Sequence, residues 1–406
     1  MAKQDINNEK ERAEKRRRRF WNACQIILRG WLLRKFRFEY DENFKPEDID
    51  GPLLVAINHT CAYDPLFIGA VFRNKPLTFI ASEHIVRSKW GKLLDKYTWL
   101  IPHRKGAKGS RTALVALKRI KKGESIFLAV EGEQTWNGRP LPVMPFTGKL
   151  VRGSGATLVT YVIEGGYLSA PRWAFGTRRG RVCGHPAGIY GPEVLKEKSD
   201  EEVEQLIAKD LNFDTWEWQK SIPGGPQSYK SRKGNADGLE RSLFGCPECG
   251  ALGTLRSDRD DIKCSCGFSV RMADTGFFEE QAPFETVCEW EEFDKKRLAE
   301  VMEEMSGKSG EHKLFSDDDI NLYTIQEEHN DEIAASGRLM LKCVDGDFIL
   351  SIGDKSFLLS DISEMTLLLA RHIVFCDKTG YYELRSIKRS RTNLRKYVIA
   401  RNLIKE

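Results

Sequence analysis

His59 and Asp64 are the first two side chains in this sequence that could do chemistry together. The apolar run 53–57 precedes His59, and Pro65 suits the first turn of a helix that continues to residue 72. His59 therefore falls in a strand-to-helix turn, where open α/β sheets place their reactive groups. An aspartate five residues after a histidine can accept the proton of one ring nitrogen, which leaves the other nitrogen free as a general base. The alternative is that Asp64 only caps the helix and His59 is a surface residue.

A second group with metal-site spacing consists of Cys246, Cys249, Cys264 and Cys266. Each tight pair can sit on a turn whose backbone amides point at thiolates, and four thiolates form a closed tetrahedral zinc site. A closed site leaves no position for water, so this zinc would be structural. The pattern resembles a zinc ribbon, with one residue inside the second pair where two are commoner. Iron in a rubredoxin-like site is the alternative.

Three further segments, together with His59 and Asp64, resemble the four sequence motifs of a known family. Asn58-His59 followed by Asp64 resembles the first motif of the glycerolipid acyltransferases, which include the bacterial 1-acylglycerol-3-phosphate acyltransferases. Segment 99–104, which ends in Arg104, resembles the second motif. The third and fourth correspond to 127–132, which ends in Glu131-Gly132, and to the apolar strand 158–162. The resemblance covers residues 58–219, under half of the chain.

The resemblance implies roles for these residues. His59 is the expected base, Asp64 orients it, and a base of this kind accelerates transfer by roughly 10²–10⁴. Acyl transfer from a thioester can be direct, with backbone amides at the helix start polarising the carbonyl. Asn58, Glu131 and Gly132 are expected to bind substrate. Without the family, Glu131 could equally be a strand-end residue bonded to loop amides.

The sequence departs from the family pattern after Gly132. Glu133 and Gln134 stand where a small hydroxyl residue and an arginine are usual. Glutamine cannot supply the charge with which arginine binds phosphate. We expect nearby cations to meet the acceptor's head group instead, and the candidates are Arg104, Lys149 and Arg152.

Cys61, two residues from His59, suggests a different mechanism. A Cys–His pair could act as a nucleophile, but we favour a small packed residue at this position. Neither a G-x-S-x-G elbow nor a Walker-type phosphate loop is present in the sequence. Serine hydrolase and nucleotide hydrolase interpretations therefore lack support.

The elements that must position these residues alternate between strand-like and helical from residue 51 to 191. Such alternation predicts an α/β fold with a mostly parallel sheet flanked by helices, as in the glycerolipid acyltransferases. The expected strands are 53–57, 77–81, 99–101, 125–130, 157–163 and 181–183, and the expected helices are 65–72, 88–97 and 110–122. A capping box at Ser199 opens another helix.

The rest of the chain predicts further parts. Short strand-like runs separated by turn signals, followed by a helix over 392–404, predict a small β-rich domain that resembles pleckstrin-homology or GRAM domains. We expect an N-terminal helical segment 1–45, an acyltransferase domain 46–222, a linker 223–242, a zinc ribbon 243–278, a connecting helix 279–315, and a β-barrel-like domain with a C-terminal helix 316–406.

The N-terminal segment is basic and amphipathic. Lys15 and four arginines precede an apolar stripe formed by Phe20, Cys24, Ile27, Leu28, Trp31 and Leu32. This pattern favours an interfacial helix on an anionic membrane, where each Lys or Arg contributes about 1 kcal/mol. The alternative is a helix packed on the protein's own core.

Composition sets the broad class. Hydrophobic residues make up 41% and charged residues 30%, as in a foldable soluble protein, and the net charge of +5 does not demand a nucleic-acid partner. The ten cysteines form no regular disulfide framework. No signal peptide and no apolar run near the ~20 residues that span a bilayer are evident. We therefore expect a cytoplasmic protein, peripheral on the inner face of the cell membrane.

Together these features predict an acyltransferase of phospholipid biosynthesis. It would move a fatty acyl chain from acyl carrier protein or coenzyme A to the hydroxyl of a lysophospholipid, with 1-acyl-sn-glycerol-3-phosphate as the leading acceptor. Structural zinc and the anionic membrane surface are expected partners; a catalytic cofactor and nucleic acid are not. The alternatives are another lysolipid, glycolipid or amino-lipid acceptor, or a non-catalytic lipid- or nucleic-acid-binding protein with a zinc-ribbon module.

Overall fold

The structure, a computed structural model, describes residues 2–83, 86, 91, 98, 100–103, 110–325, 332–387 and 391–405. It divides into two compact units. Unit 1 comprises Met1–Pro171 and Thr177–Tyr229, and unit 2 comprises Arg172–Gly176 and Lys230–Glu406. The main break falls inside segment 223–242, which the sequence predicts to be a linker. The second half of that segment is buried in unit 2, where Arg241 donates to the carbonyls of Trp173 and Ala370.

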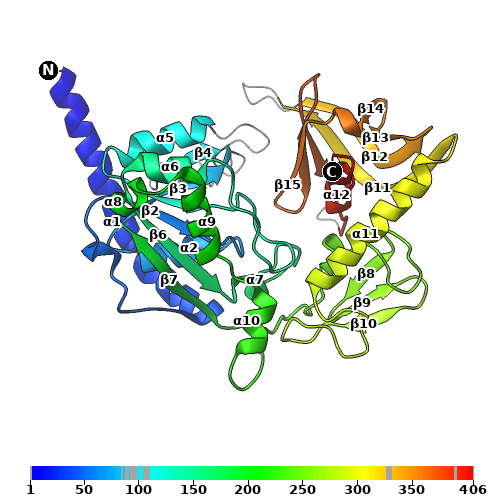
Figure 1. Cartoon of the computed structure of the whole chain (residues 1–406), viewed down its shortest axis with the longest axis horizontal. Helices are drawn as coiled ribbons and strands as arrows, with labels where there is room; N and C mark the ends of the chain where they lie inside the picture. The colour runs from blue at the N-terminus through cyan, green and yellow to red at the C-terminus, as the bar shows by residue number, and fades with distance from the viewer. Residues whose placement is uncertain are drawn as a thin grey trace. The chain divides into compact units, whose positions relative to one another are not determined.

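Unit 1 is built on one seven-stranded sheet with the order β1-β7-β6-β2-β5-β3-β4 (Figure 1). The strands from β6 to β4 are parallel, whereas β7 runs antiparallel to β6. This arrangement confirms the predicted fold class. The strands are β1 (Phe38–Tyr40), β2 (Leu53–Ile57), β3 (Leu77–Ser82), β4 (Ile101–His103), β5 (Ser125–Ala129), β6 (Thr157–Glu164) and β7 (Val182–Tyr190).

Two apolar cores cover the two faces of this sheet. Because side chains alternate along a strand, Val55 joins the core shared with α1 and α2, whereas Leu54 joins the core shared with α5, α6 and α9. The central strand β2 is buried along its whole length. The helices of unit 1 are α1 (Ala2–Phe36), α2 (Asp64–Val71), α5 (Ser110–Ile120), α6 (Thr147–Ser154), α7 (Gly166–Ser169), α8 (Pro192–Lys196), α9 (Asp200–Asp210) and α10 (Thr215–Ser221).

Local sequence signals explain some of these helices and miss others. The capping box predicted at Ser199 is present: its hydroxyl accepts the Glu202 N–H, and the Glu202 carboxylate accepts the Ser199 N–H. The sequence does not predict helix α6, because the helix contains two glycines, Gly148 and Gly153, and glycine is a poor helix former. A Cβ atom on Gly148 would lie 1.9 Å from the Asp200 carbonyl oxygen, so the close contact of α6 with α9 requires glycine there. The predicted helix 88–97 lies almost wholly outside the described residues.

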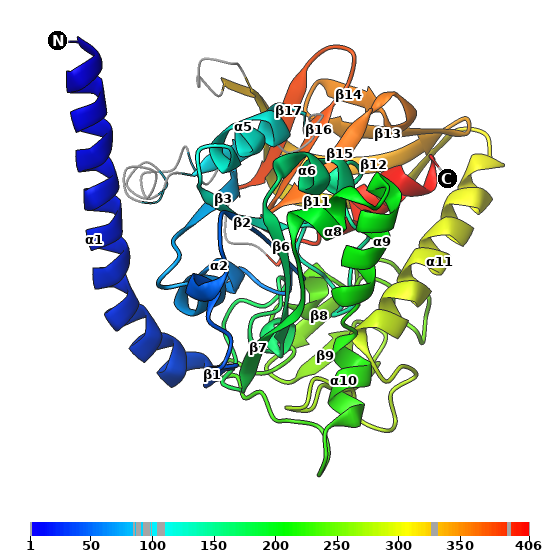
Figure 2. The same cartoon turned by 60° about the vertical axis from the view of Figure 1, so that its left-hand side comes forward.

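Helix α1 runs past α2 and packs on unit 1 with a face that includes Leu28 and Leu32 of the predicted stripe but not Ile27 (Figure 2). Its buried side chains include Trp21, Gln25, Leu32 and Phe36. Ile27, which the sequence assigned to the same stripe as Leu32, is 77% exposed. The predicted stripe contains only apolar residues, because it rests on apolar spacing. The buried face of α1 also contains the polar Gln25, whose side chain donates to the Gly69 carbonyl.

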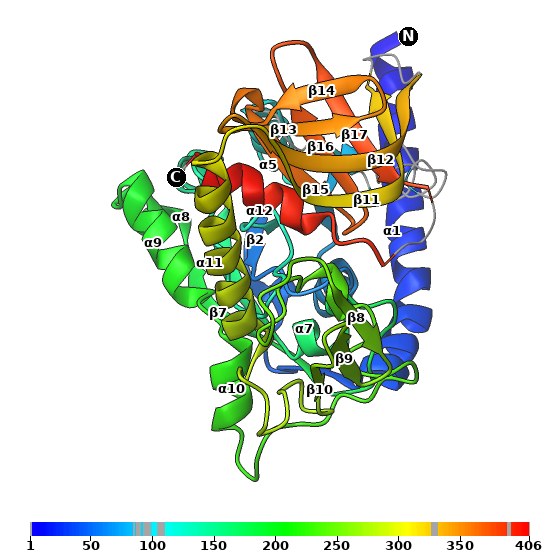
Figure 3. The same cartoon turned by 90° about the vertical axis from the view of Figure 1, so that its right-hand side faces the viewer.

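Unit 2 contains a small antiparallel ribbon, a long helix and a second seven-stranded sheet (Figure 3). The second sheet is antiparallel, with the order β14-β13-β12-β11-β17-β16-β15, and α12 follows it in the chain. The β-rich C-terminal part is thus confirmed, and the pleckstrin-homology-like resemblance stays a prediction. The elements are β8 (Leu255–Asp258), β9 (Asp261–Cys264), β10 (Ser269–Arg271), α11 (Val287–Ser306), β11 (Glu311–Thr324), β12 (Glu332–Val344), β13 (Asp347–Ile352), β14 (Lys355–Leu358), β15 (Glu364–Leu368), β16 (His372–Cys376), β17 (Tyr381–Ser386) and α12 (Arg395–Leu403).

Candidate active site and metal centre

His59 and Asp64 form a hydrogen-bonded pair at the carboxyl end of β2. His59 follows the strand directly, and Asp64 is the first residue of α2. The His59 Nδ1 atom lies 2.8 Å from Asp64 Oδ2. The Asp64 side chain is fully buried, whereas the His59 side chain is 18% exposed. A carboxylate accepts hydrogen bonds only, so the proton of this bond belongs to Nδ1, and the lone pair of the neutral ring lies on Nε2.

Asp64 is also bound by the two residues that follow the histidine. The amides of Thr60 and Cys61 donate to Oδ2 at 2.7 and 3.0 Å. The Thr60 hydroxyl donates to Oδ1 at 2.8 Å, and the Cys61 thiol lies 3.3 Å from the same oxygen. These donors fix the aspartate and the loop around it. The Thr60 and Cys61 amides are therefore engaged by the aspartate, and the expectation that amides at the helix start polarise the substrate carbonyl stays a prediction.

Cys61 has the environment of a packed thiol. Its side chain is buried, and burial together with the Asp64 carboxylate raises the pKa of the thiol well above its usual range. A thiolate is the nucleophilic form of cysteine. The structure therefore disfavours the Cys–His nucleophile pair and agrees with the preferred interpretation of Cys61 as a small packed residue.

The loop after β5 holds the backbone of His59 from the other side. Glu131 Oε1 accepts the His59 N–H at 3.1 Å, and Oε2 accepts the Leu141 N–H at 3.1 Å. The Thr135 N–H donates to the His59 carbonyl at 3.0 Å. Both backbone groups of His59 are thus bound by this one loop. Glu131 acts here as a positioning residue whose two oxygens bridge loop amides.

Asn58 and Gly166 support the same turn through β6 and α7. The Asn58 side chain donates to the Ile163 carbonyl and accepts the Ile163 N–H, at 3.0 and 2.8 Å. A Cβ atom on Gly166 would lie 2.1 Å from Thr60 Oγ1, so only glycine allows α7 to approach the His59 turn this closely. Asn58 is buried, and its amide bridges two strands, so the geometry makes it a positioning residue as well.

A small recess beside His59 brings in an arginine that the sequence analysis missed. The recess has a volume of about 10 Å³, roughly that of one water, and its lining includes His59, Glu131, Thr135 and Arg139. Arg139 Nε lies 3.0 Å from Asp214 Oδ2, and its side chain is 46% exposed. Arg139 is the first arginine after Glu131-Gly132, which is the signal that could have identified it.

The three cations predicted to meet the acceptor lie elsewhere or outside the described residues. Arg152, on α6, forms an ion pair with Asp200 of α9 at 2.5 Å. Lys149, on the same helix, is exposed to solvent. Neither residue lines the recess at His59. Arg104 lies outside the described residues.

Gly132, which the sequence suggests for substrate binding, adopts a positive φ of 67° at the turn after β5.

The four predicted cysteines meet in unit 2 as a candidate metal centre. Their sulfur atoms all lie within 4.8 Å of one another. The Sγ atoms of Cys246 and Cys266 are 3.7 Å apart, and those of Cys249 and Cys264 are 3.8 Å apart. A tetrahedral zinc with Zn–S bonds of about 2.3 Å would separate its sulfurs by about 3.8 Å. The donor set and its spacing therefore fit zinc.

Helix α11 holds the first turn of this cluster in place. Asp294, which is buried, accepts the amides of Phe244 and Gly245 at 2.8 and 2.9 Å. Trp290 Nε1 donates to the Gly245 carbonyl at 2.9 Å. Since Gly245 precedes Cys246, these contacts fix the position of the first ligand.

The fold and the pair together define a His–Asp centre at the carboxyl end of a mostly parallel sheet. Residues 35–164, which contain this centre, match the family model described as Acyltransferase. This match confirms, for these residues, the resemblance to acyltransferases seen in the motifs. A search of curated proteins found no match. Among solved structures, the chain is similar to the 1-acyl-sn-glycerophosphate (LPA) acyltransferase PlsC from Thermotoga maritima, with 18% identity and a TM-score of 0.41 over 52% of this chain and 80% of that chain.

The buried Glu131 predicts a pH dependence of stability. Burial raises the pKa of Glu131 from 4.5 to about 7. The hydrogen bonds from the N–H groups of Leu141 and His59 lower this pKa, but burial is the larger effect. The folded chain therefore holds this proton more tightly than the unfolded chain, and the free energy of unfolding falls as the pH rises from about 4.5 to about 7. The full shift corresponds to roughly 3 kcal/mol. Urea unfolding of wild type and Glu131→Gln across this range measures the effect.

The variant should lose this component of the pH dependence, because glutamine does not titrate. Relative to Glu131→Gln, the wild type should become less stable towards neutral pH. A stability difference between the two proteins that stays constant over the range would contradict the account.

Proposed function

We propose that this protein transfers a fatty acyl chain from a thioester of acyl carrier protein or coenzyme A to the hydroxyl of a lysophospholipid. The observation that supports this most directly is the 2.8 Å bond between His59 Nδ1 and Asp64 Oδ2, inside a domain of the acyltransferase family. The pair supplies a base, and acyl transfer to a hydroxyl requires one.

The proposed reaction is one direct displacement. His59 Nε2 takes the proton of the acceptor hydroxyl while the hydroxyl oxygen attacks the thioester carbonyl carbon. The C–S bond then breaks, and the proton on Nε2 passes to the leaving thiolate, so that the products are an ester and a free thiol. Asp64 keeps the ring in position and stabilises the imidazolium that forms.

Arg139 is our candidate for recognition of the acceptor's phosphate. It shares the recess with His59, and a guanidinium binds phosphate through paired hydrogen bonds. Asp214 Oδ2 accepts from its Nε atom at 3.0 Å, which holds the guanidinium beside the recess. We therefore retain 1-acyl-sn-glycerol-3-phosphate as the leading acceptor, in a pathway of phospholipid biosynthesis, with Arg139 in the role that sequence analysis gave to Arg104, Lys149 and Arg152.

We also propose that the four-cysteine cluster binds one structural zinc ion. All four positions of the tetrahedron are taken by thiolates, so the ion would supply folding energy and no reaction chemistry. In addition to Asp294 and Trp290, Arg297 contacts this part of the chain, since its Nε donates to the Gly250 carbonyl at 3.3 Å.

A third proposal places α1 on the membrane surface, peripheral on the inner face of the cell membrane. Among the described residues, no helix is long and apolar enough to span a bilayer. Ile26 and Ile27 are 81% and 77% exposed, and both lie on the solvent side of a helix whose other side packs on unit 1. Exposed basic side chains, Arg18 and Arg19, precede them. An apolar strip beside cations is the composition of interfacial helices on anionic lipid.

The first prediction from the proposed function concerns the base, His59. His59→Ala should lower the rate of acyl transfer to lysophosphatidate by at least about 10². Asp64→Asn should also lower it, because an amide cannot accept all the hydrogen bonds that the carboxylate accepts. Cys61→Ala is the matched control in the same turn and should keep most of the activity. Transfer of a labelled acyl group from acyl carrier protein and from coenzyme A measures all three.

The acceptor panel separates the substrate question from the mechanism. Monoacylglycerol lacks the phosphate of lysophosphatidate. Arg139→Gln should therefore lower the ratio of the rate with lysophosphatidate to the rate with monoacylglycerol, whereas Lys149→Gln should leave this ratio unchanged. Full activity in His59→Ala together with an inactive Cys61→Ala would refute the proposed mechanism.

The second prediction concerns the metal. Purified protein should contain one zinc per chain, and Cys249→Ser should reduce the zinc content and unfold the ribbon around residues 246–270. Unit 1 should stay folded, because structural zinc stabilises the segment that binds it. Elemental analysis and hydrogen exchange measure both effects, with Cys24→Ser as a control outside the cluster. A folded ribbon with four alkylatable thiols and no zinc would exclude the site.

The third prediction concerns α1. Ile26→Ser with Ile27→Ser should reduce co-sedimentation with both anionic and neutral vesicles, because it removes exposed apolar surface. Arg18→Gln with Arg19→Gln should reduce binding to anionic vesicles selectively, by about fivefold per charge. Leu32→Ala is the matched control, since Leu32 is buried. It should lower stability by about 2–5 kcal/mol and leave vesicle binding of the folded protein unchanged. Unaltered vesicle binding in the isoleucine variant would remove the membrane role of this face.

A further inference from the structure

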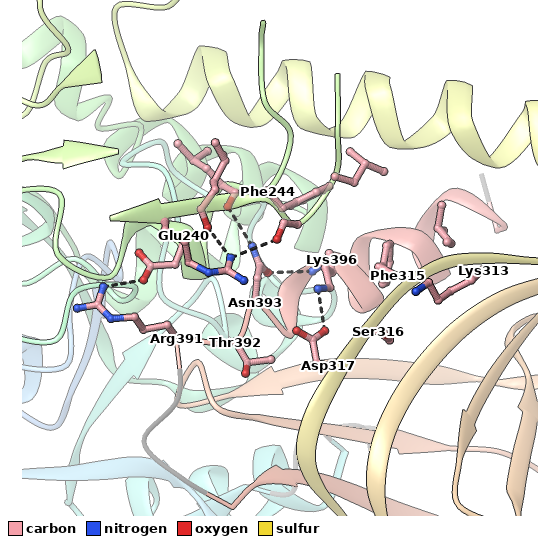
Figure 4. Close-up of a pocket in the computed structure, with 16 residues that line it drawn as sticks. Glu240, Phe244, Lys313, Phe315, Ser316, Asp317, Arg391, Thr392, Asn393 and Lys396 are labelled. Carbon is pink, nitrogen blue, oxygen red and sulfur yellow. Dashed lines mark hydrogen bonds and ion pairs between the residues drawn. The ribbon is translucent and has the colours of Figure 1, made fainter. Parts of the chain in front are cut away.

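Unit 2 contains a cavity of about 390 Å³ that the proposed reaction does not use (Figure 4). Its walls come from segments that lie far apart in the chain. They are the ribbon turn 252–256, the start of β11 at 313–317, and the segment 391–396 that enters α12, with 240–244 completing the lining. A volume of this size falls within the range of about 300–1,000 Å³ that small-molecule sites occupy.

The cavity is lined by more positive than negative charge. Two of its cations are matched: Arg391 pairs with Glu240 at 2.7 Å and with Asp237, which lies outside the lining, at 2.8 Å, and Lys396 pairs with Asp317 at 2.7 Å. Two more line the same cavity, Arg256 and Lys313. Within the described ranges, neither Arg256 nor Lys313 forms an ion pair with a carboxylate, and Arg256 donates to the carbonyls of Gly253 and Leu255 instead. The lining therefore holds two cations in excess.

Lys396 is the deepest of these cations. Its side chain is only 4% exposed, and a Cβ atom on Gly253 would lie 3.7 Å from Nζ, so the ribbon turn closes over the ammonium group. Burial lowers the pKa of Lys396, Asp317 opposes that change, and the nearby charge of Arg256 lowers the pKa further. Two cations held close together in a partly buried site repel each other, and an anion between them would relieve the repulsion.

The start of α12 adds to the positive potential. The N-cap residue, Leu394, offers no side-chain cap, and the Asn393 side chain accepts the Lys396 N–H at 3.1 Å. Thr392, Asn393 and Lys396 line the cavity, so the amino end of the helix lies beside it. Helix amino ends favour anions because their first N–H groups lack partners within the helix.

We propose that this cavity binds a phosphate-bearing ligand, held by Arg256, Lys313 and Lys396 at the amino end of α12. A phosphate monoester has a charge of about −1.5 to −2 at neutral pH, which balances the two excess cations. The shared chemistry is the phosphate group, whether it belongs to a soluble metabolite or to a phospholipid head group. The site lies wholly within unit 2 and does not depend on the proposed acyl transfer.

Isothermal titration calorimetry of the full chain with inorganic phosphate and with monomeric dihexanoyl phosphatidate tests this proposal. Wild type should bind at least one probe saturably at this site. Arg256→Gln and Lys313→Gln should each weaken that binding by about tenfold, because each removes one charge-assisted contact. Both side chains are exposed, so the variants should fold. Lys308→Gln, an exposed lysine of unit 2 that does not line the cavity, is the matched control and should bind like wild type.

The two probes distinguish the source of the phosphate. Dihexanoyl phosphatidate can also bind at the proposed acyl-transfer site. We therefore assign to the cavity only the component of binding that Arg256→Gln weakens. If that component is at least about tenfold tighter for dihexanoyl phosphatidate, the ligand is a lipid head group; otherwise it is a soluble phosphate. Absence of saturable binding for both probes overturns the proposal, and so does an equal loss in Lys308→Gln.

Discussion

The buried carboxylate of Asp64 is the constraint on which the candidate active site depends. Its two oxygens accept from the His59 ring, from two backbone amides, from a hydroxyl and from a thiol. A charge removed from water is stable only when such donors replace its hydration. The loop therefore has to wrap around Asp64, and the orientation of His59 is a consequence of that folding requirement. The same bonds that satisfy the carboxylate set the geometry of the base.

The parallel sheet supplies the rest of the support. Strands β5 and β6 flank β2, so the residues after all three strands meet at one edge. Glu131 comes from the end of β5 and Ile163 from the end of β6, and each binds the backbone or the side chain beside His59. Motif residues that the sequence suggests for substrate binding thus hold His59, the proposed base, in place. Arg139, which we propose meets a substrate anion, lies on the loop that Glu131 anchors.

The parts of this account that follow from sequence are those set by local patterns. The run 53–57, the pair His59 and Asp64, and the four cysteines rely on short-range spacing, and the structure places each as that spacing requires. Long-range contacts decided the rest. Arg139 is separated from His59 by 80 positions, and only the pairing of β2 with β5 brings their loops together. Likewise, the buried face of α1 depends on the Gly69 carbonyl that Gln25 binds, and spacing along the helix cannot show that.

The central claim is that Asp64 fixes the ring of His59 with its proton on Nδ1 and leaves Nε2 as the base. The most direct test is the ¹⁵N NMR spectrum of histidine-labelled protein, with the His59 signals assigned by comparison with His59→Ala. In its neutral form the ring should be protonated at Nδ1 and unprotonated at Nε2, and Asp64→Asn should remove this preference. A neutral ring protonated at Nε2 in the wild type would contradict the claim, because no lone pair would then face the acceptor hydroxyl.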